Sequence, residues 1–187
     1  MIRCFIAVQL PPAVIQYLKL ISTQLRGLDL QGRFVPPESV HLTLKFLGNI
    51  EESRVDRLGE RIEQCCQQSQ AFELEAGSLG VFPHSKRPRV AWVGLGASRE
   101  LSELHRCTEG SLAQEGFEPD KRPFHPHLTL LRLKSQRNVA RLASLINRTE
   151  RQSLKFRVEE VHLFQSLLHP DGARHLKLAT SQLRMKE

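Results

Sequence analysis

Two four-residue segments of this chain share one sequence and carry residue types that could do chemistry: His41-Leu42-Thr43-Leu44 and His127-Leu128-Thr129-Leu130. In both, leucines alternate with His and Thr, which is the period-of-two pattern of a β-strand with one buried face. Each strand then presents an imidazole and a hydroxyl side by side on its other face. Two such strands, brought together, would place two imidazoles and two hydroxyls around one small ligand.

This set of groups suits acid–base chemistry on a phosphate ester. Imidazole titrates at about pH 6.5, so one ring can donate a proton while the other accepts one at neutral pH, and each transfer is typically worth about 10² to 10⁴-fold. Threonine hydroxyls can donate hydrogen bonds to non-bridging phosphate oxygens. Neither segment contains a nucleophile oriented by a base. The simplest reaction is therefore direct attack by water on a phosphodiester, without a metal.

Other residues near the two segments have open interpretations. Strict alternation places Lys45 on the face of His41, where it either assists phosphate binding or is a solvated lysine. His125 and His127 form a His-x-His pair, but Ser39 stands at the matching position before His41 and no carboxylate follows at ligand spacing, so we expect no metal site. Three aromatic residues could stack on a nucleobase, but we expect them in the core: Phe46, Trp92 and Phe124. Five further histidines have no partner pattern: His84, His105, His162, His169 and His175.

Composition favours a globular protein that binds polyanions. The chain has 187 residues, a net charge of +7 and an isoelectric point of about 9.6. A basic balance favours nucleic acid or phosphorylated substrates, although a basic surface that serves only solubility is the alternative. The basic residues are scattered, which argues against a dedicated nucleic-acid arm.

The cysteines and the apolar segments indicate a cytoplasmic protein. The four cysteines form no C-x-x-C pair, and we expect all of them to be reduced structural thiols: Cys4, Cys65, Cys66 and Cys107. The N-terminal apolar run is too short for a signal peptide, and no segment approaches the length of a membrane span.

The order strand, helix, motif strand, helix, strand occurs twice along the chain. The expected elements of the first copy are Arg3–Leu10, Ala13–Leu25, Val40–Leu47, Glu51–Gln68 and Ala71–Phe82, with a loop at Gly32–Pro37. Those of the second are Arg89–Leu95, Glu100–Gln114, His127–Leu133, Val139–Asn147 and Leu154–Phe164. Both His41 and His127, and Ile6 and Trp92, are separated by 86 positions. An internal repeat of this kind implies two similar structural units.

The expected fold is α+β, with two similar lobes related by a pseudo-twofold around a central cleft. Each lobe would be a mainly antiparallel sheet with helices on its outer face, because the motif strands alternate cleanly. A parallel α/β sheet is the alternative. We expect one bilobal domain over residues 1–187, with repeats at roughly 1–82 and 88–165 and a C-terminal hairpin at 166–187 that turns at His169-Pro170-Asp171-Gly172.

Four segments of the sequence resemble those of a known protein family. The segments FIAVQLP, PPESVHLTLKFLG, RVAWVGL and RPFHPHLTLLR are similar to those of the two-histidine (2H) phosphoesterase superfamily, and nearest to its RNA 2′,3′-cyclic phosphodiesterase branch, also called 2′–5′ RNA ligases. The resemblance covers nearly the whole chain. It implies a bilobal α+β fold and metal-free hydrolysis of a terminal 2′,3′-cyclic phosphate to a 2′-phosphate.

The resemblance also implies roles for individual residues. His41 would donate a proton to the leaving 3′-oxygen, His127 would activate water, and Thr43 and Thr129 would hold the phosphate. Arg132 matches an arginine of the family's second motif and is a candidate phosphate contact. Strict alternation turns Arg132 away from His127, so that role requires a bend at the end of the strand.

Two other functions are compatible with the same residues. The reverse reaction, joining a cyclic phosphate end to a 5′-hydroxyl through a 2′–5′ linkage, needs the same acid and base. A non-catalytic RNA- or nucleotide-binding module is the third hypothesis. For the enzyme we expect an RNA or nucleotide substrate with a 2′,3′-cyclic phosphate end, no cofactor, no membrane association and a monomer.

Overall fold

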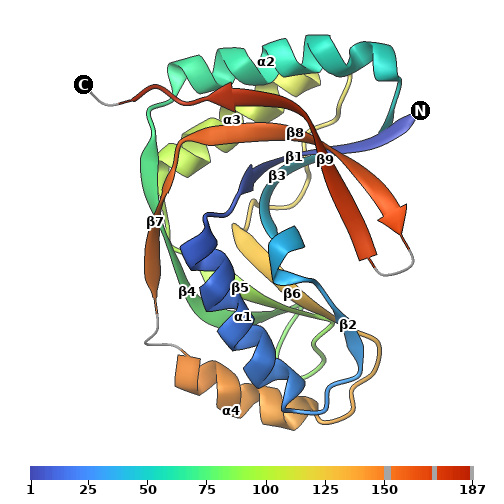
Figure 1. Ribbon diagram of the computed structural model, residues 1–187, viewed down its shortest axis with the longest axis vertical. Coiled ribbons are helices and arrows are strands. Elements are labelled where there is room, and N and C mark those ends of the chain that lie inside the picture. Colours follow the sequence, from blue (N-terminus) through green and yellow to red (C-terminus); the bar gives the residue numbers. More distant parts are fainter. Residues whose placement is uncertain (150–152, 170–171, 186–187) are drawn as a thin grey trace.

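A computed structural model describes residues 1–149, 153–169 and 172–185, which form two antiparallel sheets with helices on their outer sides (Figure 1). The first sheet has the strand order β3 (His41–Ile50), β1 (Ile2–Gln9), β8 (Glu160–His169) and β9 (Gly172–Gln182). The second has the order β2 (Gly32–Phe34), β6 (His127–Leu133), β5 (Val90–Leu95), β4 (Phe72–Phe82) and β7 (Leu154–Val158). The predicted two-lobed α+β class is confirmed.

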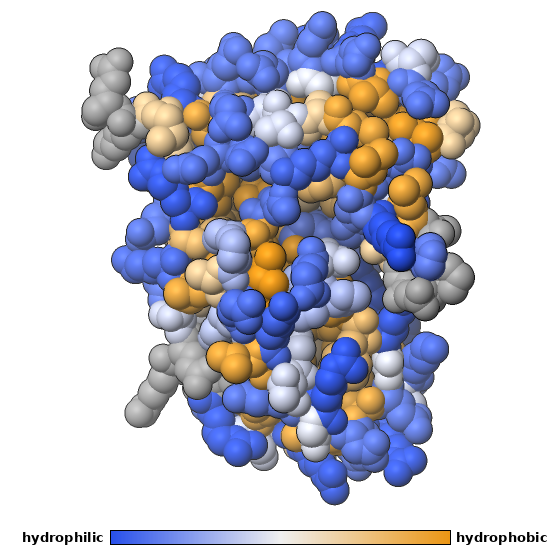
Figure 2. All heavy atoms as spheres, in the orientation of Figure 1, coloured by the Kyte–Doolittle hydropathy of each residue, from blue (hydrophilic) through white to orange (hydrophobic). Residues whose placement is uncertain are grey.

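Helices cover the two sheets at opposite ends of the molecule (Figure 1). Helix α2 (Val55–Gln68) packs on β8, β9 and α3 (Arg99–Ala113), whereas α4 (Val139–Thr149) packs on β4 and against α1 (Pro12–Arg26). Helix α1 illustrates the local rule: Pro12 occupies its first turn, and Val14, Leu18, Ile21 and Leu25 form its buried stripe. Figure 2 shows hydrophilic residues over α2 and over the opposite end of the molecule. None of the helices in the described part of the chain is long and apolar enough to cross a membrane.

The two lobes do not coincide with the two sequence repeats. Strand β4, the last of the first repeat, pairs with β5 in the second sheet, and β8 from the end of the chain pairs with β1 in the first sheet. The first half of β4 also pairs with β7, joining the ends of both repeats. Each repeat thus contributes strands to both sheets, so the lobes share one hydrophobic core that includes Leu42 and Leu128.

Two expected segments differ in the structure. The single strand predicted at 154–164 is split, because the chain passes at Glu159 from the second sheet to the first. Strand β8 then continues into the hairpin partner β9, and the predicted turn residues Pro170 and Asp171 lie outside the described residues. The loop predicted at Gly32–Pro37 contains a short strand, β2, which pairs with β6.

The prediction of four reduced cysteines is wrong for one pair. A disulfide joins Cys65 of α2 to Cys107 of α3, whereas Cys4 and Cys66 are free and buried. Cys65 and Cys107 are 42 positions apart in the sequence. Their proximity results from the packing of α2 against α3, which cysteine spacing alone does not reveal.

Candidate active site

Strand β3 presents His41 and Thr43 to a cleft, as alternation predicts, and then changes face. Leu42 and Leu44 are buried. In the pairing with β1, Ala7 lies opposite Thr43 and Ile6 lies opposite Lys45, so Leu44 is an extra residue that forms a β-bulge. Because the side-chain period of a strand is two, one extra residue exchanges the faces of everything after it.

Strand β6 contains the same irregularity at the same distance from its histidine. Trp92 of β5 lies opposite Thr129 and Ala91 lies opposite Leu131, so Leu130 is the extra residue. The bulge returns Arg132 to the face of His127 and Thr129, and all three line the cleft. It provides the irregularity that the predicted phosphate contact of Arg132 requires.

The same bulge shows that Lys45 does not share the face of His41. Only 3% of Lys45 is exposed, and the residue does not line the cleft. Its ammonium lies 2.9 Å from a carboxylate oxygen of Glu109 and donates a 2.7 Å hydrogen bond to the carbonyl oxygen of Glu118. Lys45 is therefore wrongly predicted as a phosphate ligand; it anchors α3 and the loop before β6 to β3.

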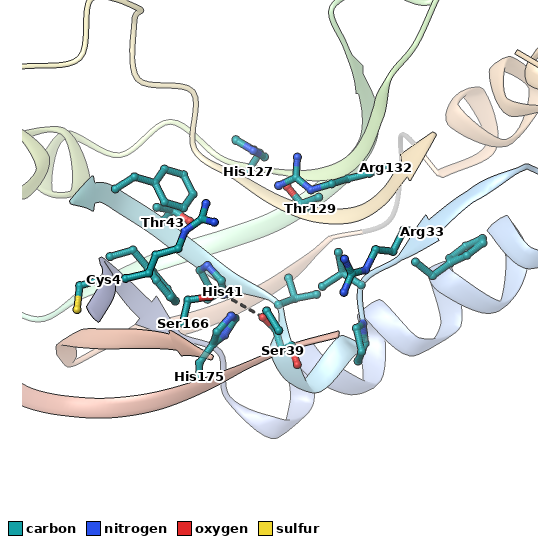
Figure 3. A pocket seen from close by; sticks show the side chains of 18 of the residues that line it. Cys4, Arg33, Ser39, His41, Thr43, His127, Thr129, Arg132, Ser166 and His175 are labelled. Carbon is teal, nitrogen blue, oxygen red and sulfur yellow. Dashed lines mark hydrogen bonds between the residues drawn. The ribbon is translucent and has the colours of Figure 1, made fainter. Parts of the chain in front are cut away.

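The cleft between the two motif strands has a volume of about 350 Å³ (Figure 3). No aspartate or glutamate of the described chain lines it. Its polar and aromatic lining residues are Arg3, Phe5, Arg33, Phe34, Ser39, His41, Thr43, Phe46, His127, Thr129, Arg132, Ser166 and His175. Among the described residues, no group of three or more His, Cys, Asp or Glu side chains could hold a metal ion.

Both motif histidines are held in the same tautomer by the residue two positions before. The Nδ1 of His41 lies 2.9 Å from the carbonyl oxygen of Ser39, and the Nδ1 of His127 lies 2.6 Å from that of His125. A carbonyl only accepts hydrogen bonds, so each Nδ1 carries the proton and donates it. The Nε2 atom of each ring is left for the cleft, as an acceptor when neutral and a donor when protonated.

The ring of His41 is enclosed by other aromatic rings. Phe5 stacks on it with a centroid distance of 4.5 Å, and His175 of β9 meets it edge-on at 4.9 Å. Burial lowers the pKa of His41 to about 4; the charges of His175 and Arg132 lower it as well, while the hydrogen bond to Ser39 opposes them. His41 is therefore neutral at pH 7 in the unliganded protein.

The surroundings of His127 are less enclosed than those of His41. Phe82 meets its ring edge-on at 5.1 Å, and Trp92 lies 6.2 Å away. Burial lowers the pKa of His127, with a contribution from the charge of Arg132, and the hydrogen bond to His125 partly offsets this. Burial thus lowers the pKa of both motif histidines, and His41 is the more enclosed of the two.

Sequence reasoning missed several residues of the cleft, among them His175, Arg33 and Phe46. His175 had no motif around it and reaches His41 only through the β8–β9 hairpin. Arg33 lay in a predicted loop. Phe46 was expected in the core, but 61% of it is exposed at the cleft because the bulge in β3 turns it outward. Phe46 follows His41 at the same distance as Arg132 follows His127. This equal spacing was the signal from which the position of Phe46 at the cleft could have been predicted.

Comparison with known proteins identifies the family. Residues 12–170 match the model of the 2′-5′ RNA ligase superfamily. The chain is 34% identical over 172 residues to an RNA 2′,3′-cyclic phosphodiesterase of Methanothermobacter thermautotrophicus, covering 91% of this chain and 93% of that protein. It is 36% identical over 140 residues to the protein of the same name from Aeropyrum pernix, covering 74% and 78%.

Solved structures agree with the sequence relatives. The crystal structure of TT0787 from Thermus thermophilus superposes with a TM-score of 0.81 at 25% identity, over 99% of this chain and 100% of that one. The apo structure of E. coli LigT gives a TM-score of 0.77 at 26% identity, over 98% of both chains. From its sequence, its fold and its two strands with paired His and Thr, the chain belongs to the 2′-5′ RNA ligase superfamily.

Proposed function

We propose that this protein hydrolyses 2′,3′-cyclic phosphate ends of RNA to 2′-phosphates, with His41 and His127 as acid and base. The observation that carries the proposal is the pair of Nδ1-anchored histidines facing one cleft, each beside a threonine. The names of the relatives, RNA 2′,3′-cyclic phosphodiesterases, support the same reaction. A LigT structure determined with 3′-AMP supports a nucleotide ligand.

In the proposed reaction, neutral His127 accepts a proton at Nε2 from a water molecule, and the water oxygen attacks phosphorus. The bond between phosphorus and the 3′-oxygen breaks, and protonated His41 donates its Nε2 proton to that oxygen. The product is a 3′-hydroxyl with a 2′-phosphate. Solvent then returns a proton to His41 and removes one from His127. Thr43, Thr129 and Arg132 donate hydrogen bonds to the non-bridging oxygens, where negative charge accumulates in the transition state.

The low pKa of His41 must be overcome before it can act as the acid. A cyclic phosphodiester carries a negative charge, and an opposite charge within a few ångströms raises the pKa of an imidazole. The bound substrate would thus favour the protonated form of the group that cleaves it. The pKa values of the unliganded protein alone favour the reverse roles, since that of His41 falls to about 4 and His127 is less enclosed. The order proposed here follows the family resemblance.

The proposal includes no metal and no cofactor, because two imidazoles supply both proton transfers. A single chain contributes both histidines, so a monomer is sufficient. Lys45 has no part in phosphate binding, because it is buried in an ion pair outside the cleft. We place the reaction in the cytoplasm, as expected from the sequence.

Product mapping tests the function. Purified protein is incubated with an oligonucleotide ending in a 2′,3′-cyclic phosphate, with and without EDTA, and the position of the product phosphate is determined. We expect a 2′-phosphate and no effect of EDTA. A 3′-phosphate would contradict the assigned leaving oxygen, and binding without any product would indicate a non-catalytic module.

The family name also covers ligation, and the same acid and base serve the reverse direction. Adding a 5′-hydroxyl oligonucleotide to the incubation measures that direction. A 2′–5′ linked product would show that the protein also catalyses the reverse reaction. The ratio of joined to hydrolysed ends then gives the balance between the two directions.

A further inference from the structure

The short strand β2 brings a second arginine beside the proposed phosphate contact. β2 pairs antiparallel with β6, and Arg33 lies directly opposite Arg132. Residues opposite each other on neighbouring strands share a face, with Cβ atoms about 4.5–5.5 Å apart. Both arginines line the cleft of the two histidines, and Figure 3 shows them on adjoining strands at one end of it.

This pair of arginines has no counter-charge within the described protein. Like charges directly opposite each other on two strands are destabilising. Neither guanidinium forms an ion pair with any described residue, and no described carboxylate lines the cleft. Some arginines elsewhere in the described chain do have a carboxylate partner: Arg57 and Arg61 both contact Glu115, and Arg157 contacts Glu159. Two guanidiniums without a carboxylate partner at this position leave a site for an anion.

The backbone around β2 holds Arg33 at a fixed position. A Cβ atom on Gly32 would lie 2.5 Å from the carbonyl oxygen of Arg132, so only glycine permits this approach of β2 to β6. Backbone hydrogen bonds anchor both ends of the pairing: Val35 donates to Leu130 at 2.8 Å, and Lys134 donates to Gln31 at 2.9 Å. Arg33 is thus placed by sheet pairing, not by a free loop.

The two arginines lie at different distances from the catalytic residues. Arg132 is on the strand of His127 and Thr129, whereas Arg33 is one strand further from those groups, at the edge of the sheet. When the histidines and threonines bind a terminal cyclic phosphate, the internucleotide phosphate that precedes it lies one nucleotide away, toward the 5′ end of the RNA. A guanidinium is suited to bind such a phosphate, because it offers a planar fork of donors and keeps its charge.

We propose that Arg33 binds the internucleotide phosphate next to the cyclic end, so that the enzyme prefers oligonucleotide ends to mononucleoside 2′,3′-cyclic phosphates. This inference rests on the proposed function and specifies its substrate class. Arg132 contacts the reacting phosphate, and Arg33 contacts the phosphate before it. Arg33 is then a specificity-determining residue that takes no part in proton transfer.

The test compares two substrates in two proteins. Values of kcat/KM are measured for a mononucleoside 2′,3′-cyclic phosphate and for a dinucleotide with the same terminal nucleoside. We expect the wild type to prefer the dinucleotide, and Arg33→Ala to reduce that preference by about tenfold or more, since a charge-assisted hydrogen bond to the internucleotide phosphate is lost. Arg33→Lys should retain part of the preference. The matched control Arg141→Ala removes an equal charge from exposed α4, outside the cleft, and should leave the preference unchanged.

A second measurement changes the substrate instead of the protein. The wild type should not prefer a dinucleotide with a neutral methylphosphonate linkage over the mononucleoside cyclic phosphate. The Arg33→Ala variant should hydrolyse the methylphosphonate and the charged dinucleotide with equal kcat/KM. The proposal is overturned if Arg33→Ala slows both original substrates equally, which would place Arg33 at the reacting phosphate, or if the methylphosphonate reacts as fast as the phosphodiester in the wild type. If the wild type hydrolyses neither substrate, the proposed function fails instead.

Discussion

Strands β3 and β6 are built alike but surrounded differently. In both, a histidine donates its Nδ1 proton to the carbonyl two residues before it, a threonine follows, and a bulge at the next leucine exchanges the faces. After the bulge, β3 turns Phe46 to the cleft, and β6 turns Arg132 to it. The shared features set the geometry of two equivalent histidines, and the bulges bring an aromatic side chain, Phe46, to the cleft from one motif strand and a cationic one, Arg132, from the other.

The two strands also differ in the residue that each buries directly after its bulge. The residue after each bulge is Lys45 in β3 and Leu131 in β6, and both are buried. Lys45 is neutralised by Glu109, whereas Leu131 packs in the hydrophobic core. The first lobe therefore holds its α3 contact by an ion pair, and the second uses apolar packing at the equivalent position.

The largest expected effect is the loss of either histidine. His41→Ala and His127→Ala should each lower kcat/KM by about 10² to 10⁴-fold, because each removes one positioned proton transfer. The double variant should lose much less than the product of the two, since the groups act as a unit. Steady-state kinetics on a cyclic-ended oligonucleotide measures this. His84→Ala, an exposed histidine outside the cleft, is the control, and full activity in either motif variant contradicts the assignment.

The buried ion pair should dominate stability in the first lobe. Lys45→Met should lower the free energy of unfolding by about 3–5 kcal/mol, because the carboxylate of Glu109 keeps its partial burial without its partner. Leu131→Met, at the equivalent position, should cost less than about 1.5 kcal/mol. Urea unfolding measures both, and the double variant Lys45→Met with Glu109→Leu should regain part of the loss. If Lys45→Met instead raised KM without lowering stability, Lys45 would be a substrate ligand after all.

The two threonines should contribute smaller and similar effects. Thr43→Ala and Thr129→Ala should each lower kcat/KM by about 10 to 100-fold, the equivalent of one hydrogen bond to a charged oxygen at roughly 1.5–3 kcal/mol. Thr→Ser at each position should restore most of the activity, because the hydroxyl is retained. Parallel kinetics on the four variants tests this, and equal losses for Ser and Ala would assign the effect to packing.

The smallest expected effect concerns pH. The pKa values of both His41 and His127 are lowered, so both rings are neutral at pH 7, and kcat/KM should rise as the pH falls below about 6.5 and one ring gains a proton. His175→Phe keeps a ring against His41 but removes an imidazole whose positive charge, once it is protonated, lowers the pKa of His41. The optimum should then move to higher pH, by less than about one unit. A shift to lower pH would exclude that influence of His175.

Much of the fold could be predicted from the sequence because its signals are local. The alternation of His41-Leu42-Thr43-Leu44 predicted which side chains are buried and which face the cleft, and the 86-residue spacing predicted two related lobes. The exchange of β4 and β8 between the lobes could not be predicted, because strand pairing depends on distant partners. The split of the predicted strand 154–164 at Glu159 could not be predicted either, because it too depends on pairing with distant strands.

The site was predictable where it depended on the motifs and not where it depended on the bulges. Placing Lys45 required knowing that Leu44 is an extra residue, and only the pairing with β1 reveals that. Arg33 and His175 enter the cleft on β2 and β9, which reach it through tertiary pairing alone. The disulfide between Cys65 and Cys107 likewise follows from helix packing.

The central claim is that two similar histidines have different roles, and a leaving-group substitution tests it most directly. A cyclic substrate with sulfur in place of the 3′-oxygen has a leaving group that needs little protonation. We predict that His41→Ala recovers, on this substrate, a large part of its roughly 10² to 10⁴-fold loss in kcat/KM, whereas His127→Ala stays impaired. Restoration of His127→Ala instead, with His41→Ala still impaired, would contradict the account and reverse the roles of the two strands.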